Sequence, residues 1–315
     1  MDSIELQKLA ERSRSMREAG MALILASAIL ALFIFIPRNF GTTPAPAVAV
    51  ATSTTPDAFA NVAVQAKAAI VYDLATGKVL YAKNADAQLP LASLTKLLTV
   101  YAAFAELSPT TPVTIPAEVT HLDMPRAFNA GQIFSLGDLA RLTLTASLND
   151  GAAAIASATA ARENTTQNAM LASAASALDL TQTYAVNGSG LDVSSSLSGG
   201  YGSAYDLARL AGALVESAPA VALATTGSSA QATSAGGTSF TVKNTDPMVG
   251  TIPRLLLSKT GYTDLAGGNL ALVFDAGMLH PIAVIVLGSS KEERFTDGTA
   301  LVAAALAHFA GIASL

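Results

Sequence analysis

The sequence is poor in the residues that proteins use most often for metal binding, redox chemistry and cross-linking. It contains no cysteine and no tryptophan, and its three histidines, His121, His280 and His308, lie far apart along 315 residues. The absence of cysteine excludes disulfides, thiolate metal sites, cysteine nucleophiles and a lipidated N-terminal cysteine. Histidines so isolated argue against a histidine-built metal site. We therefore expect neither a metal nor another cofactor.

Charged residues are scarce as well. Only 13% of the residues are charged, whereas 51% are hydrophobic, and the formal net charge is −5. A soluble domain carries about twice this charged fraction, so part of the chain is expected to lie in lipid or in a large apolar core. High hydrophobicity with a small net charge excludes disorder as the main state. The acidic balance also argues against a nucleic-acid partner, which needs a basic surface.

The longest apolar run, residues 19–36, contains no charged residue. A helix over this run would be about 27 Å long, close to the thickness of the hydrocarbon layer of a bilayer. The basic residues that flank the run are Lys8, Arg12, Arg14 and Arg17 before it and Arg38 after it. Because positive charge marks the cytoplasmic side, we predict a cytoplasmic N-terminus (1–18), one transmembrane anchor (19–36) and export of the rest.

A cleaved signal peptide is the main alternative to this anchor, because small residues suited to cleavage follow at 45–47 and 47–49. The run exceeds a usual signal-peptide core, however, and Arg38 separates it from those sites. The abrupt charged flanks disfavour a third interpretation, a buried soluble helix. An anchor would place the protein in the cytoplasmic membrane with an extracytoplasmic domain, whereas cleavage would make the domain secreted or periplasmic.

The rest of the chain divides into a linker and one domain-sized block. Residues 37–65 are rich in Pro, Ala and Thr and follow neither a helical nor an alternating pattern, which is typical of a tether. The elements expected in residues 66–315 are strands at 69–72 and 79–81, helices at 91–107 and within 137–180, strands at 254–259, 269–275 and 282–287, and a helix at 293–312. Because strands from both ends must meet in one sheet, this order predicts an α+β fold with a mainly helical lobe.

The first of three polar motifs is Ser93-Leu94-Thr95-Lys96, at the start of the apolar helix predicted at 91–107. Residues three apart share one face of a helix, so the serine hydroxyl and the lysine amine should meet. Burial lowers the pKa of a lysine, and a neutral amine can take the proton of a serine nucleophile. The alternative is a capping serine followed by a lysine whose amine reaches solvent, and this motif alone does not decide between the two.

The other two motifs also have plain structural alternatives. Ser147-Leu148-Asn149 lies between two predicted helices, and the Asp150-Gly151 that follows is strong turn chemistry. Lys259-Thr260-Gly261 ends an apolar strand, where a cation, a hydroxyl and a glycine suit the binding of a carboxylate at close backbone approach. The alternative for the last motif is an edge-strand lysine and a turn glycine.

The three motifs are far more specific together than apart, because each occurs once and they occur in this order. They are the signature set of penicillin-binding proteins and active-site serine β-lactamases. With its surrounding residues at 92–96, 147–150, 187–192 and 259–263, the chain resembles the serine D-alanyl-D-alanine carboxypeptidases, the low-molecular-mass penicillin-binding proteins. The resemblance covers residues 66–310. It implies a β-lactamase/transpeptidase-like fold, an antiparallel sheet flanked by helices plus a helical lobe.

The resemblance also implies a two-step acyl transfer on peptidoglycan stem peptides that end in D-Ala-D-Ala, with β-lactam antibiotics as covalent inhibitors. Ser93 would attack the penultimate carbonyl, and Lys96 would act as the base. Ser147 and Asn149 would relay protons and hold the substrate amide.

The same resemblance assigns the binding of substrate to the third motif. Lys259 and Thr260 would bind the terminal carboxylate, with Gly261 allowing the peptide to approach. The backbone N–H groups of Ser93 and Tyr262 would form the oxyanion hole, which stabilises the charge that develops in acyl transfer.

Two rival functions share parts of this pattern. A class A β-lactamase needs a glutamate to activate the deacylating water, and neither Glu163 nor Glu216 lies in the sequence context of that residue. A catalytically idle muropeptide-binding scaffold is disfavoured because Ser93 and Lys96 are intact. One departure from the family is Gly151, where relatives often have alanine.

Overall fold

The computed structural model of the chain describes residues 13–27 and 57–311. Residues 13–27 form a helix. Within the described ranges, no helix is both long enough and apolar enough to cross a membrane. Residues 28–36 of the predicted anchor and 37–56 of the predicted linker lie outside those ranges, so the anchor stays a prediction.

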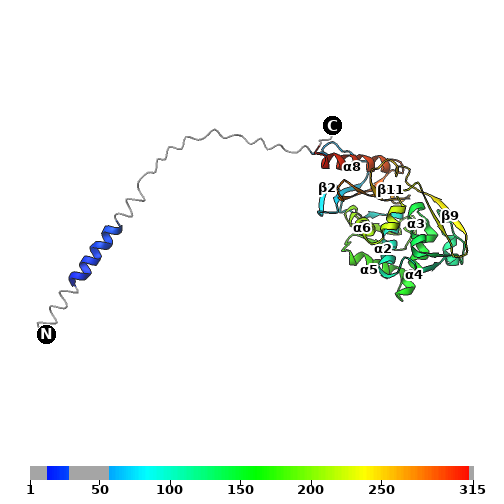
Figure 1. The fold of residues 1–315 in the computed structure, drawn as a ribbon, viewed down its shortest axis with the longest axis horizontal. Coiled ribbons are helices and arrows are strands. Elements are labelled where there is room, and N and C mark those ends of the chain that lie inside the picture. The colour runs from blue at the N-terminus through cyan, green and yellow to red at the C-terminus, as the bar shows by residue number, and fades with distance from the viewer. Residues whose placement is uncertain (1–12, 28–56, 312–315) are drawn as a thin grey trace. The chain divides into compact units, whose positions relative to one another are not determined.

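Five antiparallel strands, in the order β10-β11-β12-β1-β2, form the main sheet of the domain, of which Figure 1 labels β2 and β11. Its strands are β1 (Ala68–Asp73), β2 (Lys78–Lys83), β10 (Leu255–Thr263), β11 (Gly267–Asp275) and β12 (Pro281–Ser289). β1 pairs with β12 along its whole length. Strands from the two ends of the domain therefore meet in one sheet, as the order of elements predicts.

Helices cover both faces of this sheet, which explains why its strands are apolar almost throughout. α8 (Glu293–Phe309) packs on one face, and α6 (Ala204–Ser217) packs on the other. Successive residues of β1 alternate between two cores, with Ile70 in the core beneath α6 and Val71 in the core beneath α8. A strand buried on both faces reads as a continuous hydrophobic run.

The helical lobe is inserted between β2 and β10, and this confirms the α+β class. Its helices are α2 (Thr95–Glu106), α3 (Leu136–Ala146), α4 (Asn149–Arg162), α5 (Gln167–Ala177), α6 and α7 (Pro219–Ala224), with the 3-10 turns η1 (Ala92–Leu94) and η2 (Ala117–His121). The small strands are β3 (Leu89–Pro90), β6 (Tyr184–Ala185) and β7 (Gly200–Gly202) in one sheet, β4 (Pro112–Thr114) with β5 (Ile133–Ser135), and β8 (Ser229–Thr233) with β9 (Ser239–Lys243).

Residues 57–65, at the end of the segment predicted to be a linker, pack on the domain. Phe59 and Val64 are buried in the core beneath α8. The carboxylate of Asp297, on α8, accepts hydrogen bonds from the backbone N–H groups of Gln65 and Ala66 at 2.8 and 2.9 Å. The sequence does not predict this packing, because residues 57–65 have no periodic pattern and pack against α8 instead of pairing with a strand of the sheet.

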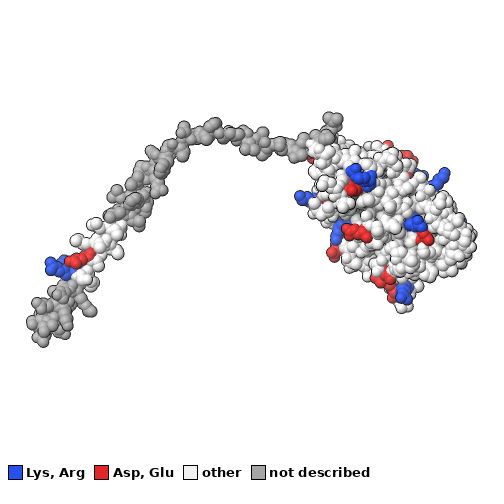
Figure 2. All heavy atoms as spheres, in the orientation of Figure 1, with Lys and Arg blue, Asp and Glu red and all other residues white. Residues whose placement is uncertain are grey.

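Charged side chains are few on the surface. Figure 2 shows them scattered with mixed sign over the face in view, without a basic patch.

Candidate active site

Ser93 lies in η1, at the junction where the small strand β3 turns into helix α2. Its neighbours Leu91, Ala92 and Leu94 are buried, whereas Ser93 itself is partly exposed. Ala92 has a left-handed backbone, with φ of 48°. A non-glycine residue there is unusual, and its surroundings must hold it in place. The serine hydroxyl is thus presented by a well-packed turn.

Lys96 is completely buried one helical turn after Ser93. Its Nζ donates hydrogen bonds to Ser93 Oγ at 2.9 Å, to Asn149 Oδ1 at 2.7 Å and to the Ser189 carbonyl at 2.7 Å. Burial lowers the pKa of Lys96 to about 7, and the nearby Asp150 carboxylate opposes the shift. A large part of Lys96 is therefore neutral near neutral pH, and a neutral amine beside Ser93 Oγ can accept its proton.

Ser147 and Lys259 come together across the helical lobe and the sheet. Ser147 ends α3 in a left-handed conformation, with φ of 60° and ψ of 35°. Lys259 Nζ donates to Ser147 Oγ at 2.8 Å and to the Thr260 carbonyl at 2.7 Å. The turn that the sequence predicts between α3 and α4 is therefore confirmed, and it directs the Ser147 hydroxyl towards Lys259.

The pKa of Lys259 lies well below its usual value, because the side chain is buried and because Lys96 and Arg294 are close. A carboxylate bound beside Lys259 would raise this pKa again, because a nearby negative charge favours the charged amine. This arrangement suits a site that receives an anion.

Asn149 begins α4, and a loop over residues 123–128 fixes its orientation. Asn149 Nδ2 donates to the Asp123 carbonyl at 2.9 Å, which turns Oδ1 towards Lys96. The next residue, Asp150, is fully buried and accepts hydrogen bonds from the N–H groups of Ala127 and Phe128, both at 2.8 Å. Asp150 therefore fastens the loop that positions the Asn149 amide.

Gly151 is the departure from the family pattern, and the packing of α4 accounts for it. A Cβ added at Gly151 would lie 2.1 Å from Thr143 Oγ1, on α3. An alanine cannot occupy this position unless Thr143 moves.

Strand β10 runs against the serine turn. A Cβ at Gly261 would lie 2.9 Å from the Leu91 carbonyl and 3.3 Å from the Ser93 N atom, so a glycine is needed for this close approach. The prediction that Lys259-Thr260-Gly261 ends a strand is wrong. β10 continues to Thr263, because the residues after the motif pair with the glycine-rich start of β11.

The remaining residues of the third motif differ in exposure. Thr260 is 4% exposed, and its Oγ1 donates to Thr245 Oγ1 at 2.7 Å. Tyr262 is 44% exposed, and Lys291 Nζ lies 5.3 Å from the centre of its ring. The structure thus brings Ser93, Lys96, Ser147, Asn149, Lys259, Thr260, Gly261 and Tyr262 to one place between α2, the α3–α4 turn and β10.

Two further residues, Ser189 and Arg294, contact the site without belonging to the three motifs. Ser189 supplies a carbonyl to Lys96, and the Asn187 side chain holds its loop by accepting from the N–H groups of Ser189 and Gly190. Arg294, on α8, is 7% exposed and donates to the Gly261 carbonyl at 2.6 Å. A backbone carbonyl leaves no mark in a sequence. The segment 187–192 stands out there only by its resemblance to the family.

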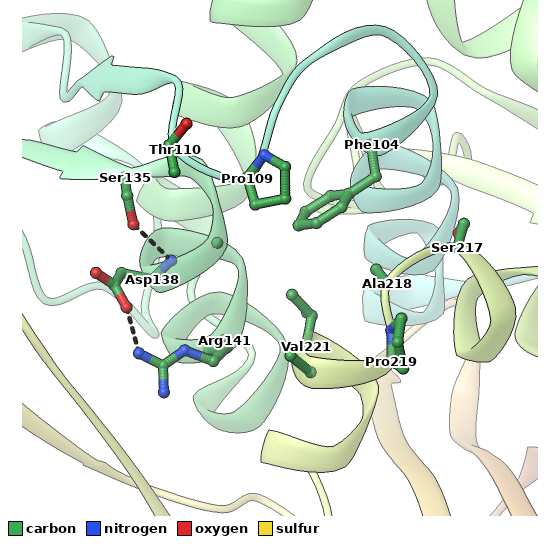
Figure 3. Close-up of a pocket in the computed structure, with 12 residues that line it drawn as sticks. Phe104, Pro109, Thr110, Ser135, Asp138, Arg141, Ser217, Ala218, Pro219 and Val221 are labelled. Carbon is green, nitrogen blue, oxygen red and sulfur yellow. Dashed lines mark hydrogen bonds and ion pairs between the residues drawn. The ribbon is translucent and has the colours of Figure 1, made fainter.

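A separate pocket of about 350 Å³ lies between α2, α3 and α7 (Figure 3). Phe104, Pro109 and Val221 line it with apolar surface, and the ion pair between Asp138 and Arg141 borders it. None of its lining residues belongs to the three motifs. This pocket and the motif cluster are therefore separate features of the domain.

The fold and the cluster together are those expected of an active-site serine enzyme, with Lys96 rather than a histidine hydrogen-bonded to Ser93 Oγ. The family model for D-alanyl-D-alanine carboxypeptidase matches residues 51–290, and the chain belongs to this family of serine hydrolases.

Known proteins similar to the chain agree with this assignment. A D-alanyl-D-alanine endopeptidase of Pseudomonas aeruginosa is 30% identical over 263 residues, which are 81% of this chain and 83% of that protein. Penicillin-binding protein D2 of Listeria monocytogenes, solved with ampicillin bound, is 27% identical with a TM-score of 0.66, covering 78% of this chain and 98% of that one. A D-alanyl-D-alanine carboxypeptidase of Mycobacterium tuberculosis shares the fold, with 24% identity, a TM-score of 0.69 and coverage of 81% and 98%.

Proposed function

We propose that the chain releases the terminal D-alanine of peptidoglycan stem peptides through an acyl-enzyme on Ser93. The observation that carries the proposal is the fully buried Lys96, whose amine lies 2.9 Å from Ser93 Oγ and has a pKa lowered to about 7. A nucleophile needs an adjacent group that can take its proton, and Lys96 can do this without histidine.

The reaction proceeds in two steps. Ser93 Oγ attacks the carbonyl of the penultimate D-Ala while its proton passes to Lys96 Nζ. The backbone N–H groups of Ser93 and Tyr262 stabilise the oxyanion. The peptide bond then breaks, and the proton that Lys96 took up passes through Ser147 to the departing D-Ala amine, which leaves Lys96 neutral again. In the second step, water hydrolyses the ester on Ser93 and regenerates the hydroxyl.

Binding of the substrate draws on the same cluster. Lys259 and Thr260 hold the terminal carboxylate, Gly261 lets the peptide lie close to β10, and the Asn149 amide holds the substrate amide. β-Lactam antibiotics present a carboxylate and a reactive carbonyl in the same way, so they acylate Ser93 as covalent inhibitors.

The direct test is mass spectrometry of a pentapeptide muropeptide incubated with the enzyme. We expect loss of one D-Ala, and Ser93→Ala should abolish it together with labelling by fluorescent penicillin. Cross-linked dimers among the products would indicate transpeptidation, and cleavage of added dimers would indicate the endopeptidase activity named for the Pseudomonas relative. Labelling that persists without Ser93 would contradict the proposal.

A β-lactamase function is not favoured. Glu163 follows α4 at the end opposite Asn149, about 20 Å along the helix, too far to activate water at Ser93. Sustained fast turnover of nitrocefin would overturn this conclusion. A binding scaffold without activity is tested by the same D-Ala release.

We further propose that residues 19–36 anchor the chain in the cytoplasmic membrane, with residues 1–18 inside and the catalytic domain outside. The uncharged run and its basic N-terminal flank support this orientation. Intact-mass measurement of the membrane fraction separates an anchor from a cleaved signal peptide, because cleavage would remove roughly the first 45 residues. Protease added outside the cell should reach the domain.

A further inference from the structure

The turn between β11 and β12 carries the two most exposed large hydrophobic residues of the described chain. Met278 and Leu279 are 101% and 91% exposed. Solvent disfavours such side chains, and paired exposed hydrophobic residues at the tip of a hairpin indicate a surface that meets something apolar.

The backbone of this turn disfavours the same two residues. Met278 and Leu279 have φ of 57° and 59°, a left-handed pair that hairpin turns usually fill with asparagine and glycine. The turn is nevertheless well held, because Asp275 Oδ1 accepts hydrogen bonds from the N–H groups of Gly277 and His280 at 2.7 and 2.9 Å. Residues that contradict both solvent and backbone preferences in an ordered turn point to a functional constraint.

Further apolar and basic groups lie at the same end of the sheet. The ring of Phe309, 38% exposed at the end of α8, lies 4.8 Å from the ring of His280. Lys78 and Arg254 are exposed at the starts of β2 and β10, and the sheet register places both at the end where β12 begins. Apolar side chains flanked by cations are the composition that binds the interface of an anionic bilayer.

The chain also enters the domain at this end. The ring of Phe59, near the first described residue of the domain, lies 6.0 Å from the ring of His308, next to Phe309. Only residues 37–56 separate the apolar run 19–36 from residue 57, where the described domain begins. The end of the domain that carries Met278, Leu279 and Phe309 is therefore also the end at which the chain from the proposed anchor enters.

We propose that Met278, Leu279 and Phe309 insert into the interface of an anionic bilayer, so that the domain rests on the membrane by this end of its sheet. The inference rests on the proposed N-terminal anchor. Tyr262 lies seven residues along β10 from Leu255, about 23 Å of strand, so the active site is held away from the lipid surface and towards the cell wall.

The absence of tryptophan makes a fluorescent test direct. The full chain is reconstituted into vesicles of anionic phospholipid with brominated acyl chains, which quench tryptophan on contact. Leu279→Trp, or Met278→Trp as a second variant, reports on the turn. Val193→Trp is the matched control, because Val193 is 54% exposed in a loop of the helical lobe. Labelling of Ser93 by fluorescent penicillin checks that each variant is folded.

We expect the brominated lipid to quench the fluorescence of the Leu279→Trp variant severalfold more strongly than that of the control variant. Replacement of the anionic lipid by a zwitterionic one should weaken this quenching. If the chain floats with the vesicles after an alkaline wash but the two variants are quenched equally, the anchor stands and membrane contact by the turn is refuted. If the chain does not float, the anchor is refuted. In that case the soluble chain is mixed with the same vesicles. Stronger quenching of Leu279→Trp than of Val193→Trp would support insertion of the turn, and equal quenching of the two variants would refute it.

Discussion

The titration of Lys96 should control how fast Ser93 is acylated. The pKa of Lys96 is about 7, because burial disfavours its charged form. About half of the amine is then neutral at pH 7, and about 1% at pH 5. If only the neutral amine takes the proton of Ser93, acylation at pH 5 should be about 50-fold slower than at pH 7, and above pH 8 the acid limb should reach a plateau.

The second-order rate constant for acylation by a fluorescent penicillin measures this dependence, because it reports on the free enzyme. The labelling reaction is stopped at a series of times at each pH between 5 and 9, and Ser93→Ala gives the background. Circular dichroism at each pH confirms that the fold persists.

Two results would refute the reasoning. A rate that is constant from pH 5 to 7 would mean that Lys96 does not act as the base. A rate that still rises tenfold per pH unit between 8 and 9 would mean that the amine keeps the ordinary lysine pKa of 10.5 despite its burial.

Three further predictions concern the residues around this lysine. Asp150→Asn removes the charge that raises the pKa of Lys96, so the acid limb of the acylation rate against pH should move to lower pH. If the plateau rate falls but the acid limb does not move, Asp150 has only a structural role. Gly151→Ala should destabilise the fold by about 1–3 kcal/mol in urea unfolding, because the added Cβ clashes with Thr143 Oγ1. A second substitution, Thr143→Ala, should remove most of this loss, since Thr143 Oγ1 has no hydrogen-bond partner to lose. An equal loss with and without Thr143→Ala would contradict the packing argument. The pKa of Lys96 is lower in the folded chain than its ordinary value of 10.5, so the unfolded chain binds more protons between these two pH values. The buried lysine therefore lowers the free energy of unfolding most below pH 7, and this destabilisation is lost as the pH rises towards 10.5. The stability of the wild type relative to Lys96→Met should therefore increase by about 2 kcal/mol between pH 7 and 9, and a constant difference would rule out the lowered pKa.

The meeting of strands from both ends of the domain in one sheet was predictable, because these strands are apolar and bounded by turns. β1, β11 and β12 are buried on both faces, and burial on both faces leaves a hydrophobic run that is visible in the sequence. The small strands β3 and β6 have two residues each and no pattern to read. Their position depends on tertiary packing, in which Gly200 of β7 lies against Thr95 of α2.

The motif residues were predictable for a different reason. Each motif alone is common, but the three together in this order are far more specific. What the sequence could not supply is how the cluster is held together. The loop fastened by Asp150 and the carbonyl of Ser189 act through the backbone, and Arg294 reaches β10 from a helix far along the chain. Such contacts depend on the packed fold rather than on local spacing.

The two buried lysines need opposite charge states for the proposed reaction. Lys96 must be neutral to take the proton of Ser93, whereas Lys259 must be charged to hold the carboxylate of the substrate. Burial lowers the pKa of both lysines, and their proximity disfavours a state in which both carry charge. An arriving carboxylate resolves the conflict, because it stabilises a proton on Lys259 and its own negative charge offsets the new cation. In the proposed reaction, Ser147, which accepts from Lys259 Nζ, would then stand between a charged lysine and the leaving amine. The anion that the site selects therefore also prepares its charges for acyl transfer.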